Sequence, residues 1–168
     1  AEFREKHPVS TRMSRYMVSE GSYLQKNNKA SYYEMGEDAL EDLFEDLEKA
    51  KHFIFIEFFI VAEGALWDKL YEILKRKIDE GVCVKFLYDD FGALLRTGKD
   101  FAPNLRKEGF QVEIFNPIHK YASKLFMNFR DHQKIVVIDG QVAYTGGFNI
   151  QAALCSGYQA GKAMAAYC

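Results

Sequence analysis

The sequence has few of the residues that would build a disulfide-bonded, metal-bound or membrane-spanning protein. It contains only three cysteines and three prolines in 168 residues. An odd number of cysteines without close pairs predicts neither a disulfide framework nor a zinc site, and it favours a reducing, cytoplasmic environment. The longest nearly apolar run, residues 53–62, is interrupted by Glu57, and it is too short for a membrane-spanning helix, which needs about 20 residues. Because the first ten residues are polar and charged rather than a signal peptide, we expect a soluble or membrane-peripheral chain.

The remaining composition is that of an ordinary globular protein with an uneven distribution of charge. A length of 168 residues suits one well-buried domain. The net charge is only −2, but residues 37–60 carry eight acidic and two basic side chains, whereas residues 96–134 carry eight basic and four acidic ones. The positive charge of residues 96–134 suits an anionic ligand, although a solvated surface explains most of the individual charges equally well.

Apolar spacing predicts alternating helices and strands. The strand at 53–61 shows no apolar and polar alternation, so it is expected to be buried on both faces. This order of elements favours an α/β fold with a mostly parallel central sheet flanked by helices. The expected helices cover residues 40–50, 66–78 and 101–108, and the expected strands cover 53–61, 82–88 and 111–115.

One stretch of the sequence carries most of the chemical information. His132-Gln133-Lys134 is followed after four residues by Asp139 and after six more by Gly146-Gly147-Phe148-Asn149. The apolar residues 135–138 predict a strand, and Asp139-Gly140 predicts a hairpin turn at its end. On a strand that includes both residues, His132 and Lys134 would point to the same side, about 6.5 to 7 Å apart. An imidazole beside a fixed positive charge is suited to attack on a phosphodiester.

This spacing resembles the His-x-Lys-(x4)-Asp-(x6)-Gly-Gly/Ser-x-Asn signature of the phospholipase D superfamily. The strands around it are similar to those of the bacterial cardiolipin synthases at residues 53–60 (FIFIEFFI), 85–92 (KFLYDDFG) and 115–117 (FNP). The Gly-Gly form of the last element also suits that branch. The resemblance covers residues 31–150 and implies the N-terminal catalytic half of a phospholipase D-like fold, with the sheet ending in the motif hairpin.

The resemblance also implies roles for the motif residues in a reaction that uses no metal or cofactor. His132 is the expected nucleophile, forming a phosphohistidine, or its general-acid counterpart. Lys134 is expected to neutralise the phosphate oxygens, and the amide of Asn149 to donate to them. Gly146 and Gly147 would let the backbone approach the phosphate. A packing role for His132 and a simple turn or bulge at the glycines are the alternative interpretations.

Five further polar residues have less certain roles. The family groups Asp139 with the catalytic residues, but on an extended strand it lies about 23 Å from His132, so we expect a structural role. Glu57 would orient His132 or Lys134, or else form an ion pair at a strand end. Arg130 shares the expected strand face of His132 and is a candidate to hold an anionic head group. Asp89 and Asp90 close a strand where α/β proteins bind ligands, and adjacent acids there are also common in solvated turns.

The two ends of the chain differ in character from its middle. Residues 1–30 lack sustained periodicity and are interpreted as a lead-in or linker, and residues 31–150 as the catalytic half-domain. Residues 151–168 hold six alanines, two cysteines and no acid, where the family continues with an acidic segment, so we expect an aberrant or truncated tail. Because cardiolipin synthases carry membrane helices ahead of this domain and a second motif copy after it, we expect a fragment.

Three functions remain open from the sequence. The first is one catalytic half of a cardiolipin synthase at the cytoplasmic face of the bacterial membrane. Its substrate would be phosphatidylglycerol or another anionic phospholipid, and its partner a second motif-bearing half or a second copy of the chain. The second is a dimeric, single-motif phosphodiesterase or nuclease, although a nucleic-acid substrate is not favoured. The third is a catalytically incomplete half-domain that only binds phosphate groups.

Overall fold

The computed structural model describes residues 5–21, 28–118 and 129–146. The chain divides into two compact units, Ala1–Ser31 and Tyr32–Cys168. The described part of the first unit contains helix α2 (Pro8–Ser19), none of whose residues is buried. This helix was not predicted, because its apolar residues are few and it lies among polar segments.

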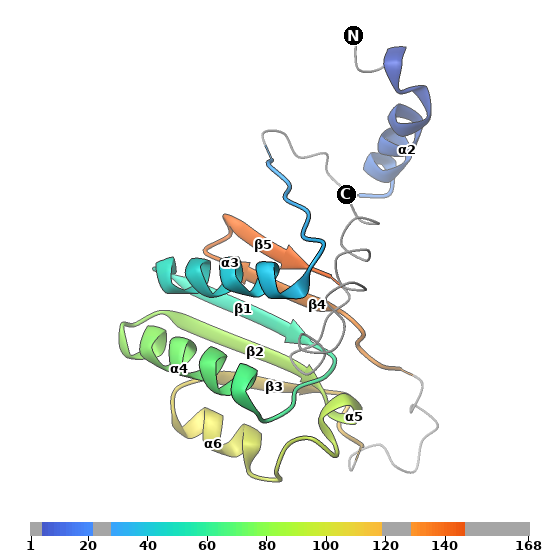
Figure 1. The fold of residues 1–168 in the computed structure, drawn as a ribbon. Coiled ribbons are helices and arrows are strands. Elements are labelled where there is room, and N and C mark those ends of the chain that lie inside the picture. The colour runs from blue at the N-terminus through green and yellow to red at the C-terminus, as the bar shows by residue number, and fades with distance from the viewer. Residues whose placement is uncertain (1–4, 22–27, 119–128, 147–168) are drawn as a thin grey trace. The chain divides into compact units, whose positions relative to one another are not determined.

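The second unit is built on a five-stranded mixed sheet (Figure 1). Its strand order is β3-β2-β1-β4-β5. The pairs β3–β2 and β2–β1 are parallel, whereas β1–β4 and β4–β5 are antiparallel. The expected α/β fold ending in a motif hairpin is therefore confirmed, and the hairpin makes one half of the sheet antiparallel. The strands are β1 (Phe53–Phe58), β2 (Cys83–Asp89), β3 (Gln111–Phe115), β4 (Lys134–Ile138) and β5 (Val142–Thr145).

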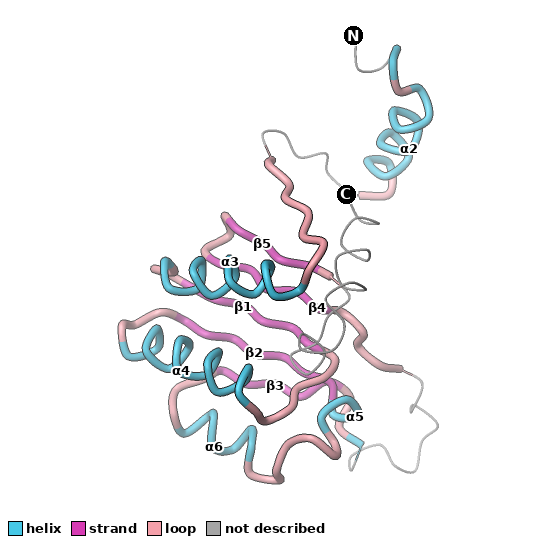
Figure 2. The backbone as a smooth tube through the Cα atoms, in the orientation of Figure 1, coloured by secondary structure: helices cyan, strands magenta, loops and turns pink. Residues whose placement is uncertain are grey.

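In the described part of this unit, helices α3, α4 and α6 lie over one face of the sheet, as Figures 1 and 2 show. Each is amphipathic and ends close to its predicted end. Helix α4 ends before Gly81 and α6 ends before Gly109, and both glycines have a positive φ. A fourth, single-turn helix begins directly after β2. The helices are α3 (Gly36–Lys49), α4 (Ala65–Asp79), α5 (Asp90–Ala93) and α6 (Phe101–Lys107).

The core lies between this helical layer and the sheet. Along β1, Ile54, Ile56 and Phe58 face the helices and are buried, whereas Phe55 is exposed and Glu57 is half-buried on the opposite face. The prediction that this strand is buried on both faces is thus wrong for the described part of the chain. Apolar residues occupy both faces of β1, so the sequence shows no alternation of apolar and polar residues. The burial nevertheless alternates, because the helices cover only one face of the sheet.

Asp139 connects the hairpin to the start of β1. Its carboxylate accepts hydrogen bonds from the backbone N–H groups of Lys51, His52 and Phe53 at 2.8, 2.9 and 2.8 Å, and its own N–H donates to the carbonyl of Phe53 at 3.0 Å. Burial opposes the charge, but the three backbone donors outweigh it and lower the pKa of Asp139 below its ordinary value. Together with Gly140, Asp139 also forms the turn, at a φ of 52° that aspartate tolerates better than most residues.

Replacing Asp139 with alanine is expected to lower the free energy of unfolding by about 1–3 kcal/mol, because the N–H groups at the start of β1 lose a charged acceptor. Asp139→Asn, which keeps one acceptor oxygen and tolerates the positive φ, is expected to cost less. Urea denaturation of the three proteins measures both effects. Equal stability of wild type and Asp139→Ala would contradict this role.

Gly92 allows helix α5 to approach the end of β1 closely. A Cβ atom placed on Gly92 would lie 1.9 Å from the carbonyl oxygen of Phe59 and 2.8 Å from its carbonyl carbon. No L-residue with a side chain can occupy this position unless one of the two backbones moves. The backbone of α5 therefore packs directly against the backbone of Phe59, the first residue after β1.

Gly92→Ala is expected to lower the free energy of unfolding by about 1–3 kcal/mol or more, because the added methyl group collides with a backbone that cannot rotate away. Gly98→Ala is the matched control, since a Cβ at Gly98 meets nothing within 4 Å, and we expect it to be neutral or slightly stabilising. Thermal and urea unfolding distinguish the two variants, and similar stabilities would refute the close contact.

Candidate active site

His132 lies in the loop just before β4 rather than on the strand. Strand β4 begins at Lys134, which pairs with Phe58 at the end of β1. The expectation that one strand carries both His132 and Lys134 is therefore wrong in detail. The imidazole instead stacks on the ring of Phe59, with centroids 4.0 Å apart and planes 28° apart, which places an exposed histidine at the edge of the sheet where β1 and β2 end.

His132 and Lys134 nevertheless come together. The Nζ of Lys134 is 3.3 Å from Nδ1 of His132 and also donates a hydrogen bond to the carbonyl oxygen of His132. Lys134 is only 8% exposed. Burial lowers the pKa of Lys134, and the negative charge of Asp131 partly opposes this shift. The loop thus presents an accessible imidazole against a lysine that has been removed from water, where its charge interacts strongly with an anion.

The hairpin brings Gly146 to the same place. The N–H of Gly146 donates to the carbonyl of Lys134 at 3.3 Å, and β5 reaches this point because Thr145 pairs with Ile135. The first glycine of the Gly146-Gly147 pair therefore lies beside the start of β4. Gly147 and Asn149 lie outside the described residues, so their predicted roles stay predictions.

Glu57 contacts the residue before His132 rather than His132 or Lys134. It hydrogen-bonds to Asp131, and this bond, burial and the negative charge of Asp131 together raise the pKa of Glu57 to about 7. Asp131 is itself buried and accepts a hydrogen bond from the N–H of Gln133 at 3.1 Å. The raised pKa favours the protonated form of Glu57, which can donate a hydrogen bond to Asp131. Glu57 borders a cavity of about 750 Å³ on the sheet face opposite the helices, with Lys85, Leu87 and Ile135 among its lining residues.

Arg130 lies elsewhere than the strand pattern suggested, whereas Asp139 lies in the expected turn. Arg130 is in the loop before His132, and its guanidinium group forms an ion pair with Asp89 at 3.2 Å. Asp139 binds the first residues of β1, whereas His132 stacks beyond the last residue of the same strand. The two motif residues are thus separated by the length of β1, about 17 Å. Asp139 contacts the turn and the strand start, which fits the structural role expected for it.

Two residues of the site were not assigned roles from the sequence: Phe59 and Asp131. Asp89, expected at a ligand site or in a solvated turn, is instead fully buried and pairs with Arg130. Phe59 lies in an apolar run of the sequence. It differs from its neighbours only because β1 ends one residue before it, which the sequence does not show. Asp131 directly precedes His132, and this adjacency is the signal that could have identified it. Within the described ranges, no group of three or more His, Cys, Asp or Glu side chains is arranged to hold a metal ion. None of the helices in those ranges has the length and apolar character needed to cross a bilayer.

The mixed sheet with its one-sided helices, together with the His132–Lys134 pair and the hairpin that follows it, defines a member of the phospholipase D superfamily. Residues 43–157 match the family described as "Cardiolipin synthase, PLD-like domain". The chain belongs to this family.

Individual relatives agree with this family. The chain is 38% identical over 148 residues to a protein of Streptococcus mutans serotype c that is described as uncharacterized, covering 88% of the chain and 32% of that relative. It is 37% identical over 126 residues to a cardiolipin synthase of Oceanobacillus iheyensis, covering 74% of the chain and 26% of the relative. The chain therefore spans about a quarter to a third of the length of these proteins.

A solved structure, the phospholipase D family member Nuc from Salmonella typhimurium, is similar to the chain with a TM-score of 0.49 and 20% identity. The similarity covers 67% of this chain and 66% of Nuc.

The carboxyl pair predicts a pH dependence of stability. The raised pKa means that folded Glu57 keeps its proton up to about pH 7, whereas an unfolded glutamate loses it near its ordinary value of 4.5. This contribution to the free energy of unfolding is complete below the unfolded pKa and is lost as the pH rises through the folded pKa. Urea denaturation between these two values should therefore show the stability of wild type falling relative to Glu57→Gln, which cannot titrate.

Glu113→Gln is the matched control, because Glu113 lies exposed in the same row of the same sheet face, aligned with Leu87 and hence with Glu57. Its stability should follow that of wild type at every pH. Parallel curves for wild type and Glu57→Gln would show that the pKa of Glu57 is not raised.

Proposed function

We propose that the chain is one catalytic half of a cardiolipin synthase, which transfers a phosphatidyl group from one phosphatidylglycerol to another through a phosphohistidine at His132. The observation that supports this function most strongly is the contact between His132 and Lys134. The 3.3 Å approach of their nitrogens joins an exposed nucleophile to a buried cation. A phosphodiester that reaches the imidazole would meet the lysine at once, where developing negative charge on phosphorus is stabilised.

The observed contact also indicates what must change when substrate binds. A lysine that donates to Nδ1 leaves the ring proton on Nε2, and an Nε2 that carries a proton cannot attack phosphorus. When Lys134 turns to a phosphate oxygen instead, Nδ1 can take the proton and Nε2 becomes the nucleophile. In this scheme Lys134 keeps the proton of the His132 ring on Nε2 until the phosphate binds. The proton then moves to Nδ1, and Nε2 can attack.

The reaction then proceeds in two displacements. Nε2 of His132 forms a bond to phosphorus, the bond to the glycerol oxygen breaks, and the departing oxygen takes a proton from a general acid. A glycerol hydroxyl of a second phosphatidylglycerol then gives up its proton to the conjugate base of that general acid and attacks phosphorus. The P–N bond breaks, which yields cardiolipin and restores the neutral imidazole.

The general acid must come from a second copy of the motif. The 168 residues contain the motif once, and the chain spans about a quarter to a third of its relatives' length. We propose that the second site element is supplied either by a further half of the same kind or by a second copy of this chain around a two-fold axis.

A lipid substrate is favoured over a nucleic acid by the surface beside the site. Phe129 is 65% exposed and directly precedes Arg130, and Phe91, which is 46% exposed, lies under the Arg130 guanidinium at 5.6 Å from its ring centroid. Leu95 nearby in the chain is 90% exposed. Exposed aromatic and aliphatic side chains around an arginine suit the interface between acyl chains and phosphate head groups, so we propose that the chain works at a membrane surface.

Head-group-labelled phosphatidylglycerol in mixed micelles, supplied to the full chain, tests this function. Wild type is expected to release glycerol and form cardiolipin, and His132→Asn is expected to lower turnover by at least about 10³-fold, because the nucleophile is replaced by a polar amide that cannot attack phosphorus. His52→Asn is the matched control, since His52 precedes β1 at the other end of that strand, and its turnover should equal that of wild type.

Mixing wild type with His132→Asn tests whether the second motif comes from another copy of this chain or from a different half. If two copies of this chain form the site, the inactive variant lowers the activity of wild type in proportion to the mixed dimers formed. Phosphatidic acid as the product would assign a hydrolase instead of a transferase. A folded wild-type chain that forms no product at any concentration would mean that it is a catalytically incomplete half-domain.

A further inference from the structure

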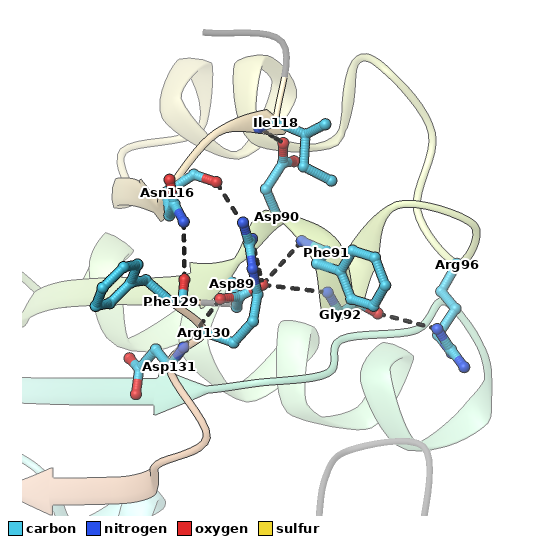
Figure 3. Close-up of polar contacts among 10 residues, drawn as sticks. All are labelled: Asp89, Asp90, Phe91, Gly92, Arg96, Asn116, Ile118, Phe129, Arg130 and Asp131. Carbon is cyan, nitrogen blue, oxygen red and sulfur yellow. Dashed lines mark hydrogen bonds and ion pairs between the residues drawn. The ribbon is translucent and has the colours of Figure 1, made fainter. Parts of the chain in front are cut away.

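Asp89 is the most completely buried charged residue in the described part of the chain and lies at the centre of the contacts drawn in Figure 3. It is the last residue of β2 and is 0% exposed. Its Oδ1 accepts hydrogen bonds from the backbone N–H groups of Phe91 and Gly92 at 2.8 and 3.3 Å and pairs with the guanidinium of Arg130 at 3.2 Å. Its Oδ2 accepts the backbone N–H of Asp131 at 3.0 Å.

These contacts connect two parts of the sheet that are not neighbours. Strand β1 lies between β2 and β4 in the strand order. The Asp89 carboxylate reaches past the end of β1 to the segment that leads into β4. In that segment it binds the side chain of Arg130 and the backbone N–H of Asp131. The residue that follows this segment is His132. The position of the imidazole is thus coupled to the end of β2 through a single buried carboxylate.

The same carboxylate also fixes the surface on which the imidazole rests. By accepting from Phe91 and Gly92 it caps α5, and the Gly92 backbone packs against the carbonyl of Phe59. Phe59 is the ring on which His132 stacks. Asp89 therefore acts on His132 by two routes, through the preceding backbone and through the stacking partner.

We propose that Asp89 is a positioning residue for His132, fixing where the imidazole stands relative to Phe59 and Lys134. Its catalytic consequence rests on the proposed function of His132, whereas its geometric consequence does not. The negative charge is required because it pairs with Arg130, whose side chain is only 12% exposed, and a neutral side chain of the same shape cannot neutralise it.

The adjacent residue provides a matched control. Asp90 has the same side chain one position later, but it accepts the backbone N–H of Ile118 at 2.7 Å. In Figure 3 its carboxylate points toward Ile118, away from Asp131. Asp90→Asn removes the same charge from the same strand end without touching the contacts to Arg130 and Asp131.

The experiment compares Asp89→Asn with Asp90→Asn in the full chain by two measurements. The first is the ¹⁵N–¹H NMR titration of the His132 ring, together with hydrogen exchange of the Asp131 amide, and it needs no turnover. The second is kcat and KM on phosphatidylglycerol. Asp89→Asn is expected to shift the His132 ring signals, to speed exchange at Asp131 and to lower kcat by roughly 10- to 100-fold with a smaller change in KM. Asp90→Asn should leave the His132 signals and kcat as in wild type.

The two proposals fail in different ways. Absence of turnover in wild type would overturn the proposed function, while the His132 titration would still decide the role of Asp89. Wild-type ring signals in a folded Asp89→Asn, or equal shifts in Asp90→Asn, would overturn the positioning role. If Asp89→Asn does not fold, Arg130→Gln replaces it, because it removes one of the four contacts and leaves α5 capped. It is expected to shift the His132 signals in the same direction, and unchanged signals would refute the proposal.

Discussion

The antiparallel pairing of β1 with β4 is the interaction on which both the site and the end of the sheet depend. It aligns Phe58 with Lys134 at one end and Ile54 with Ile138 at the other. Because β1 also pairs in parallel with β2, its end meets the end of β2 at one edge of the sheet, and the chain arriving at β4 passes across that edge. The loop that carries His132 must therefore lie over the ends of two parallel strands, where side chains from all three segments can reach it.

A second constraint is the burial of charge at this edge. Lys134, Asp89 and Asp131 are all among the buried residues, and burying isolated charges is costly unless they are paired or bonded to the backbone. Here Asp89 is matched by a guanidinium and by backbone N–H groups, while Asp131 hydrogen-bonds to Glu57 and accepts the N–H of Gln133. Lys134 donates to a carbonyl and contacts an imidazole, so its partners in these hydrogen bonds, unlike those of Asp89, include no group of opposite formal charge.

The sequence predicted the periodic elements well, and it failed where tertiary contacts decide. β3 and the hairpin turn at Asp139 and Gly140 follow from local patterns of residue type. The burial of β1 on one face only, and the start of β4 at Lys134 instead of before His132, depend on what packs against each strand, which the local pattern does not contain. The pairing of Glu57 with Asp131 and of Asp89 with Arg130 joins residues 74 and 41 positions apart, and a single sequence offers no means to match one buried acid with its partner over such separations.

The three hydrogen bonds that Asp139 accepts at the start of β1 have a consequence at the far end of the strand. In β4, Lys134, Val136 and Ile138 are buried, and Ile135 and Val137 alternate with them. A slip of one residue between β1 and β4 would exchange these two sets and turn the lysine to the other face of the sheet. The apolar residues alone would tolerate such a slip, because isoleucine and valine occupy both sets. By holding one alignment at the turn, Asp139 determines on which side of the sheet the positive charge stands, although it lies at the other end of β1.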